Sequence, residues 1–328
     1  MDNSGFNRAL GTCVVATVLA GCGAAQPPLI RQSAPFQGQI HSASIASHTP
    51  ELKPAIGSPE YKITAPLIYA TNVGNTNVTV YRANRKHPAP LATITDGLTN
   101  PFGACIDGQG TLYVTNEPAS AGWVSVYPLG KTKPSITITA GINGPADCAI
   151  DGEGDLWIAN AYGANVTEYL HGANKPHTVI TKGLLEPVGI AFDNTGNLYV
   201  GNGPLASQQN VEVYAPGSKS PSRTITSGIT SPCGLAIDPN GTLYVANVYQ
   251  NNVTEYRSSS SDPYQTITNG MDHPEGVTVN KKGTLYVSNV GNGTILEFAP
   301  GSLTPLRRQI SKGLYEPESV AYYPALLP

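Results

Sequence analysis

Charged side chains are scarce in this sequence. Asp, Glu, Lys and Arg make up only 12% of the 328 residues, about half the usual share of one quarter. This scarcity argues against a protein built from long surface helices and against a chain that charge keeps disordered. The 19 basic residues form no stripe and the formal net charge is −3, so we expect no nucleic-acid partner.

Long apolar runs are also missing. The most apolar stretch, ALGTCVVATVLA at residues 9–20, is too short to span a bilayer but suits the hydrophobic region of a secretory signal. The tetrapeptide Leu19-Ala20-Gly21-Cys22 that closes it resembles the lipobox of bacterial lipoproteins. That resemblance implies cleavage before Cys22, acylation of this cysteine (palmitate is a typical chain) and a place in the bacterial cell envelope. An ordinary signal peptide, cleaved after small residues, is the alternative.

The segment after the signal has little apolar periodicity. Residues 23–60 are rich in Pro, Ser, Ala and Gln, and such a segment cannot bury enough surface to offset the entropy of ordering it. We therefore expect a signal peptide at 1–21, a flexible tether at 22–60 and a folded domain at 61–328.

What the sequence does have is turn formers, β-formers and a repeat. It contains 35 Gly and 28 Pro, and a strand-like motif ending in Asn occurs six times, at Leu67–Asn72, Leu112–Asn116, Leu156–Asn160, Leu198–Asn202, Leu243–Asn247 and Leu285–Asn289. The asparagines are 44, 44, 42, 45 and 42 residues apart. Six copies at this period predict a β-propeller with four strands per blade.

Each repeat supplies the four strands in the same order. An inner strand follows a proline, as in residues 187–193, and an Asp-x-x-Gly turn leads to the second strand, which carries the motif. The first copy lacks an inner strand, whereas residues 318–322 at the C-terminus form an inner strand with no blade of its own. We therefore predict an all-β, six-bladed propeller of antiparallel strands whose first blade is completed by the C-terminal strand, which removes the open edges.

The repeat also carries a family resemblance. Leu-Tyr-Val-Thr-Asn at 112–116 is similar to the signature of YVTN-type propeller repeats, and Pro187-x-Gly-Ile-Ala-x-Asp193 followed by Gly-x-Leu-Tyr-Val resembles NHL repeats. The resemblance spans about residues 61–323. It implies the propeller architecture and leaves the activity open, because propellers host hydrolases, lyases, sensors and binding platforms.

Residues that every blade shares are expected to be scaffold. Two aromatic columns, one in the second strand and one in the third, account for half of the 24 aromatic residues, and we expect them to pack between blades. The asparagine that ends each second strand is expected to cap the turn after it.

Two of the five cysteines suggest a crosslink. Cys105 lies four residues after its proline and Cys148 three after its own, on the inner strands of adjacent blades. The opposite parity turns the two side chains toward each other, and export permits oxidation. A Cys105–Cys148 disulfide is one interpretation, and two small buried cysteines are the other. The sequence has no CxxC pair or His-rich spacing, so we assign no metal ligands and no catalytic residues.

Function should lie where the blades differ. The residues around the leading proline of each inner strand vary, and we expect them at the mouth of the central channel. Carboxylates and one imidazole gather there in neighbouring blades, at Asp147, Glu186, His273, Glu275, Glu316 and Glu318. Tyr162 and Tyr249 occupy matching positions in turns on the same face.

Two interpretations of these residues compete. The acids could converge on a polar ligand or a divalent cation, or they could be a solvated rim. We favour a lipid-anchored, monomeric binding or scaffold module that uses its channel face for a protein, glycan or small molecule, and that meets the membrane only through its lipid. The alternative is a metal-dependent hydrolase or lyase similar to gluconolactonase or virginiamycin B lyase, but the sequence has no clearly matched set of their metal-binding positions.

Overall fold

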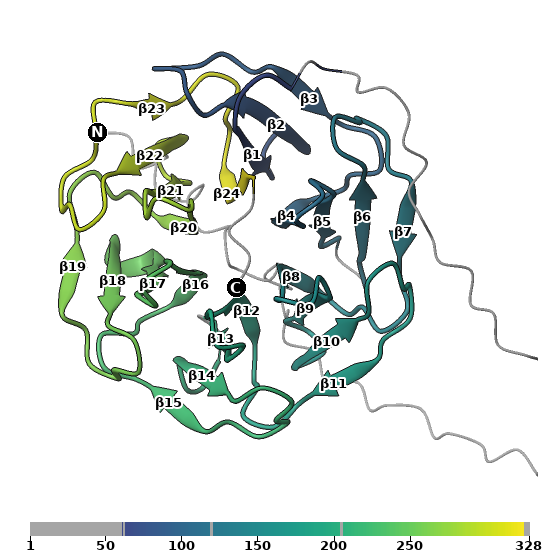
Figure 1. The fold of residues 1–328 in the computed structure, drawn as a ribbon, viewed down its shortest axis with the longest axis vertical. Helices are drawn as coiled ribbons and strands as arrows, with labels where there is room; N and C mark the ends of the chain where they lie inside the picture. The colour runs from purple at the N-terminus through teal and green to yellow at the C-terminus, as the bar shows by residue number, and fades with distance from the viewer. Residues whose placement is uncertain (1–60, 62, 119–120, 204–205, 325–328) are drawn as a thin grey trace, which may run out of the picture.

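The domain is a closed ring of six four-stranded antiparallel sheets around a central channel (Figure 1). The computed structural model describes residues 61, 63–118, 121–203 and 206–324. The predicted six-bladed β-propeller is therefore confirmed. The predicted signal peptide, Cys22 and the tether lie outside the described residues.

Every blade has its inner strand at the channel and three further strands outward in chain order. The first three blades are β24 (Pro317–Tyr323), β1 (Leu67–Asn72), β2 (Asn77–Arg82) and β3 (Ala92–Ile94); β4 (Pro101–Ile106), β5 (Leu112–Asn116), β6 (Trp123–Tyr127) and β7 (Ile136–Ile138); and β8 (Pro145–Ile150), β9 (Leu156–Asn160), β10 (Asn165–Tyr169) and β11 (Thr178–Ile180).

The other three blades repeat this order. They are β12 (Pro187–Phe192), β13 (Leu198–Asn202), β14 (Asn210–Tyr214) and β15 (Arg223–Ile225); β16 (Pro232–Ile237), β17 (Leu243–Asn247), β18 (Asn252–Tyr256) and β19 (Gln265–Ile267); and β20 (Pro274–Val279), β21 (Leu285–Asn289), β22 (Thr294–Phe298) and β23 (Gln309–Ile310). The helical content of the described residues is one short 3₁₀ turn, η1 (Val248–Gln250).

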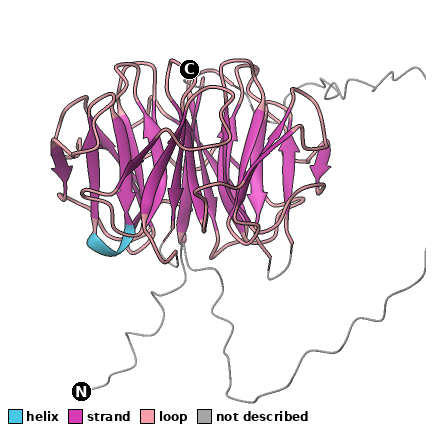
Figure 2. Ribbon diagram, turned by 90° about the horizontal axis from the view of Figure 1, so that it is seen from below, coloured by secondary structure: helices cyan, strands magenta, loops and turns pink. Residues whose placement is uncertain are grey.

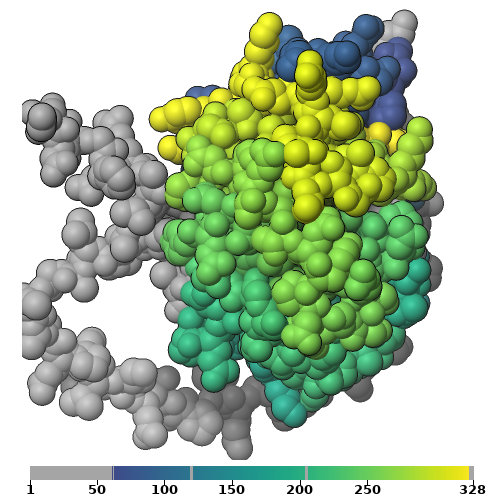
Figure 3. Space-filling view, turned by 90° about the vertical axis from the view of Figure 1, so that its left-hand side faces the viewer, coloured from purple at the N-terminus to yellow at the C-terminus, as the bar shows by residue number. Residues whose placement is uncertain are grey.

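The C-terminal strand closes the ring. β24 pairs antiparallel with β1, with Tyr323 opposite Leu67, and the space-filling view shows C-terminal residues (yellow) against the first blade (blue) (Figure 3). The N–H of Tyr315, just before β24, also donates to Oδ1 of Asn72 at 3.2 Å. Closure leaves no inner edge open for pairing with another chain.

The asparagine column holds the loops that lead into the inner strands. In blade two the Thr99 N–H donates to Oδ1 of Asn116 at 2.9 Å, while the Asn116 amide donates to the Ser125 hydroxyl at 3.1 Å. Each of the six asparagines is fully buried. These bonds of Asn116 thus go to the loop that precedes the blade and to the third strand, and they do not show the expected cap on the following turn.

The aromatic column of the third strands joins neighbouring blades. The Tyr127 hydroxyl donates to the carbonyl of Asp96 at 2.6 Å, and that of Tyr169 donates to the carbonyl of Ala140 at 2.6 Å. Both rings are almost completely buried, and burial of such a ring contributes about 2–3 kcal/mol. These rings are scaffold, as expected.

The ring has two unlike faces (Figure 2). The mouth face consists of the loops that lead into the inner strands and the turns that join second and third strands, including η1. The opposite face holds the Asp-x-x-Gly turns, the loops between third and fourth strands, the start of β1 and the end of β24. No described helix is long and apolar enough to cross a membrane.

Candidate functional site at the channel mouth

The mouth of the channel is a small cavity built from the starts of the inner strands. Its volume is about 30 Å³, which holds about two water molecules. All six residues that follow the leading prolines line it, together with five from the next position: Phe102, Ala146, Val188, Cys233, Glu275 and Glu318, and Gly103, Asp147, Gly234, Gly276 and Ser319.

The residues two positions after the leading prolines form a second ring around the channel. Glycine is the commonest residue in this ring because adjacent inner strands approach closely there. A Cβ atom on Gly189 would lie 1.9 Å from the carbonyl oxygen of Cys233, and one on Gly276 would lie 2.6 Å from that of Glu318. Glycine avoids both clashes. Asp147 and Ser319 are the two departures from glycine in this ring, so they alone present side chains at this level of the cavity.

Hydroxyl groups fix the backbone around this ring in three blades. The ladder of β4 and β5 shifts register between Pro101 and Ala104, which leaves the Gly103 N–H without a ladder partner. It donates instead to the Thr115 hydroxyl at 2.7 Å, and that hydroxyl donates to the Ala146 carbonyl of the next blade at 3.0 Å. The hydroxyls of Thr71 and Ser288 donate in the same way to a backbone carbonyl of the next blade, those of Phe102 and Glu318. The Thr71 hydroxyl also accepts a hydrogen bond from the Ser319 N–H. These bonds between blades give the mouth a rigid frame.

Glu275 and Glu318 face the cavity from neighbouring blades. Their exposed fractions are only 2% and 3%. Burial raises the pKa of Glu318 well above its usual range, and the charge of Glu275 beside it, followed by a carboxyl–carboxyl hydrogen bond with Glu275, raises it further. These two acids are therefore not a solvated rim.

A third buried acid, Glu117, was missed by the sequence interpretation. It follows β5, is 6% exposed and raises the pKa of Glu318 through its charge. Burial raises its own pKa, which a hydrogen bond from the Tyr162 side chain opposes. A signal was present, because the equivalent residue in each other blade is Val, Ala or Gly. Tyr162, a predicted site residue, thus lies beside an acid that was not predicted.

Tyr249 and Glu186 lie on the same face. Tyr249, in η1, is 44% exposed, and Glu186 is 6% exposed. Burial raises the pKa of Tyr249, and the charges of Glu275 and Glu186 raise it further. The tyrosine ring is therefore close to the acids of two other blades.

His273 and Glu316 take a different position from their neighbours. Each precedes a leading proline in the left-handed conformation, with φ of 51° and 50°. His273 Nδ1 lies 3.1 Å from Asp272 Oδ1, and neither residue lines the cavity. Glu316 acts on the mouth only through its charge, which raises the pKa of Glu318.

Asp147 marks the boundary between the mouth cavity and the channel below, whose volume is about 150 Å³. The Ile190 N–H donates to Oδ2 of Asp147 at 3.4 Å. Burial raises the pKa of Asp147 to about 7, although backbone N–H groups of Cys148 and Ile190 oppose the shift. This carboxyl is thus close to half-protonated at neutral pH.

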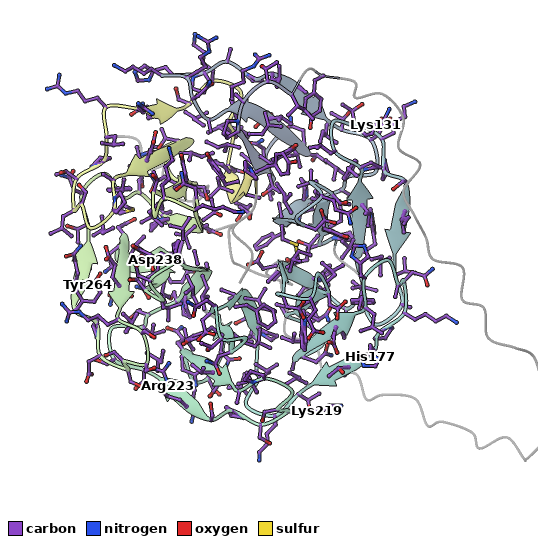
Figure 4. The ribbon with its side chains drawn as sticks, in the orientation of Figure 1. Lys131, His177, Lys219, Arg223, Asp238 and Tyr264 are labelled. Carbon is purple, nitrogen blue, oxygen red and sulfur yellow. A yellow bond between two sulfur atoms is a disulfide. The ribbon has the colours of Figure 1, made fainter. Side chains whose placement is uncertain are left out.

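A disulfide braces the channel wall below Asp147. The structure joins Cys105 of β4 to Cys148 of β8, with Cα atoms 5.6 Å apart. Both residues line the lower channel, and Figure 4 draws the bond in yellow between these two inner strands. It links the blades on either side of the Gly103–Asp147 contact.

A compact metal-ligand group occurs elsewhere among the described residues. The oxygens of Asp151, Asp155 and Glu168 lie within 4.8 Å of one another in blade three. Two of these carboxylates already accept backbone hydrogen bonds in their turns, from Asp155 and His171. The acids of the described mouth do not form such a group, so they offer no ready-made cage for a cation.

Comparisons with known proteins identify the fold and no family. No family model and no curated protein matches this sequence. Among solved structures, one chain of a nidogen/laminin complex superposes with a TM-score of 0.67 at 14% identity, over 79% of this chain and 98% of that one. Hydrazine synthase of Kuenenia stuttgartiensis superposes with a TM-score of 0.53 at 16% identity, over 70% and 72%.

The raised pKa of Asp147 predicts that this residue lowers the stability of the folded protein in a pH-dependent way. A carboxyl whose pKa is higher in the folded state makes stability fall as pH rises from its unfolded value, about 4, to its folded value, about 7. Asp147→Asn keeps the acceptor for Ile190 and removes the charge. We expect wild type and variant to melt together near pH 4, and the variant to melt a few degrees higher at pH 8.

Asp193→Asn is the matched control with the opposite sign. Burial raises the pKa of Asp193, but hydrogen bonds from Asn197 and Thr195 outweigh it, so the pKa is lowered. This variant should therefore melt below wild type at neutral pH, with the gap closing in acid. Thermal melts from pH 3 to 8 measure both. A constant difference between Asp147→Asn and wild type across this range would contradict the buried-acid assignment.

Proposed function

We propose that this protein is an exported, lipid-anchored propeller that binds a partner through its mouth face. One observation carries the proposal: the residues directly after the leading prolines differ from blade to blade and meet at one cavity, whereas the shared columns serve the scaffold. A fixed frame with a variable rim is the usual arrangement of a binding surface. The sequence resemblance supports a finer assignment of the blades to the NHL or YVTN repeat type.

The side on which the chain enters the ring supports binding through the mouth face. β1 begins at Leu67 on the opposite face, so the predicted tether joins the domain on that side. An anchor at Cys22 then lets the mouth point away from the membrane and toward partners in the cell envelope. The similar chain from the nidogen/laminin complex is consistent with a propeller that functions in a protein–protein complex.

The enzymatic alternative has less support. Asp147, with a pKa of about 7, is suited to proton transfer. However, the mouth acids do not gather into a three-ligand group within the described residues. We therefore favour binding over hydrolysis or lyase chemistry.

Site-specific crosslinking tests the binding proposal. A photoreactive amino acid replaces Tyr249 on the mouth face, or Leu303 on the opposite face as a control of similar exposure. In intact cells we expect a discrete crosslinked product from position 249, lost when Glu275→Gln and Glu318→Gln are added, and none from position 303. Crosslinks at 303 alone would refute the mouth face as the binding surface.

Fractionation tests the anchor. Cys22→Ala removes the acylated atom, so the variant should move from the membrane fraction to the soluble fraction, while Cys13→Ala should leave fractionation unchanged. Membrane retention of the Cys22 variant with an uncleaved signal would weaken the test, so the N-terminus of the product is sequenced as well. Retention of a cleaved Cys22 variant would refute lipid anchoring.

A further inference from the structure

Charge is distributed unevenly between the two faces of the propeller. Of the fifteen Lys and Arg among the described residues, two, Lys182 and Lys312, belong to the mouth face. Eight acids lie on that face: Asp96, Glu117, Asp147, Glu186, Asp272, Glu275, Glu316 and Glu318. Figure 4 views the opposite face, where Lys131, Lys219 and Arg223 lie toward the rim. Acids therefore outnumber bases on the mouth face, although Asp96 pairs with Lys133 at 4.0 Å, and the acids that are ionised attract cations from a distance.

The carboxyl group of Glu318 is buried at the mouth without a hydrogen-bond donor from the described N–H and O–H groups. It is 3% exposed, lines the cavity, and neither of its oxygens accepts a hydrogen bond from a described N–H or O–H group that satisfies normal geometry. Glu275 and Glu318 can share a hydrogen bond only if one of the two carboxyls is protonated and donates to the other. A buried carboxyl in this setting is costly to keep unless a donor or a positive charge arrives.

The cavity wall opposite the acids is apolar. Phe102, Ala146 and Val188 occupy the same ring as Glu275 and Glu318, but on the other blades. Among the described residues that line the cavity, none is basic. The residues directly after the leading prolines therefore form an acidic side and an apolar side of a cavity of about 30 Å³, with Asp147 one position deeper.

We propose that the mouth cavity binds a primary alkylammonium group, as in a lysine side chain or an aliphatic diamine. The inference rests on the proposed binding function and names the ligand class. An ammonium group is about the size of a water molecule and offers three N–H donors, which suit Glu318 and Glu275. The alkyl stem lies along Phe102 and Val188, as lysine stems commonly do on apolar surfaces.

The size and geometry of the mouth distinguish this ligand from other cations. A guanidinium head group is a planar fork and is bulkier than an ammonium, so it fits less well against the acids of a cavity of about 30 Å³. A divalent cation requires several oxygens gathered around one point, and the described mouth acids are not so gathered. Tyr249 does not line the cavity, but burial and the charges of Glu275 and Glu186 raise the pKa of its hydroxyl, so it lies near the same acids.

The titration of Glu318 gives the complex a pH signature. Because the pKa of this carboxyl is raised by burial and by Glu275, an arriving ammonium group must displace a proton. Affinity should therefore rise as pH increases above the ordinary glutamate range, about 4.3, while the probe amine, with a pKa near 10, keeps its charge.

Calorimetric titration of the full-length protein tests the inference. The probes are 1,5-diaminopentane and Nα-acetyl-lysine amide, which separate a free amine from a lysine side chain, with Nα-acetyl-arginine amide and Ca²⁺ as comparisons. We expect one or both lysine-like probes to bind, with a loss of at least tenfold in affinity in Glu318→Gln and in Glu275→Gln. Glu153→Gln, an exposed acid on the opposite face, is the matched control and should bind as wild type does.

Several results would overturn the inference. These are no binding of either amine, equal binding by wild type and Glu318→Gln, tighter binding of the arginine probe or Ca²⁺, or affinity that does not change with pH in the wild type. The last measurement needs no variant, so a Glu318→Gln protein that fails to fold leaves the test intact. If crosslinking at position 249 succeeds while the amines fail, the binding function stands and only the ligand class is wrong.

Discussion

Pairing of the C-terminal strand β24 with β1 is the interaction on which the rest of the structure depends. It closes the ring, and it also brings Glu318 and Ser319, from the end of the chain, to the same cavity as residues of the other five blades. The hydrogen bond from the Tyr315 N–H to Asn72 fixes the same junction. The strand that stabilises the fold thus also carries the central residue of the proposed site.

The residues at the mouth can vary because the backbone of the scaffold is held by hydrogen bonds from other, shared side chains. Buried asparagines bind the loops before the inner strands, and buried tyrosines bind the loop of the preceding blade. Threonine and serine hydroxyls complete the backbone around the narrow ring. With the backbone held in this way, the residue after each leading proline can be Phe, Ala, Val, Cys or Glu without loss of the blade. The price of that freedom is a pair of neighbouring buried acids, Glu275 and Glu318, in which burial raises the pKa of Glu318.

The fold could be predicted almost fully from the sequence, because a period of 42–45 residues and a missing first strand leave few arrangements. The site could be predicted only in part. Strand position placed Glu275 and Glu318 at the channel, since they follow prolines that start inner strands. Loop residues were harder: His273 contacts Asp272 outside the cavity, because a left-handed φ before the proline sets a direction that residue spacing does not encode. Glu117 was missed because its turn is longer than those of four other blades, although its column is otherwise small or apolar.

The mouth holds buried carboxyl groups, among which Glu318 has a raised pKa, rather than a solvated acidic rim. Carbon-13 NMR of the glutamate carboxyl groups, titrated from pH 3 to 9, tests it most directly. The account predicts at least one glutamate that titrates well above the usual value of about 4.3, absent from Glu318→Gln and shifted to lower pH by 1,5-diaminopentane. If every glutamate titrates in the ordinary range and none responds to the amine, the mouth is a solvated rim and the proposed site does not exist.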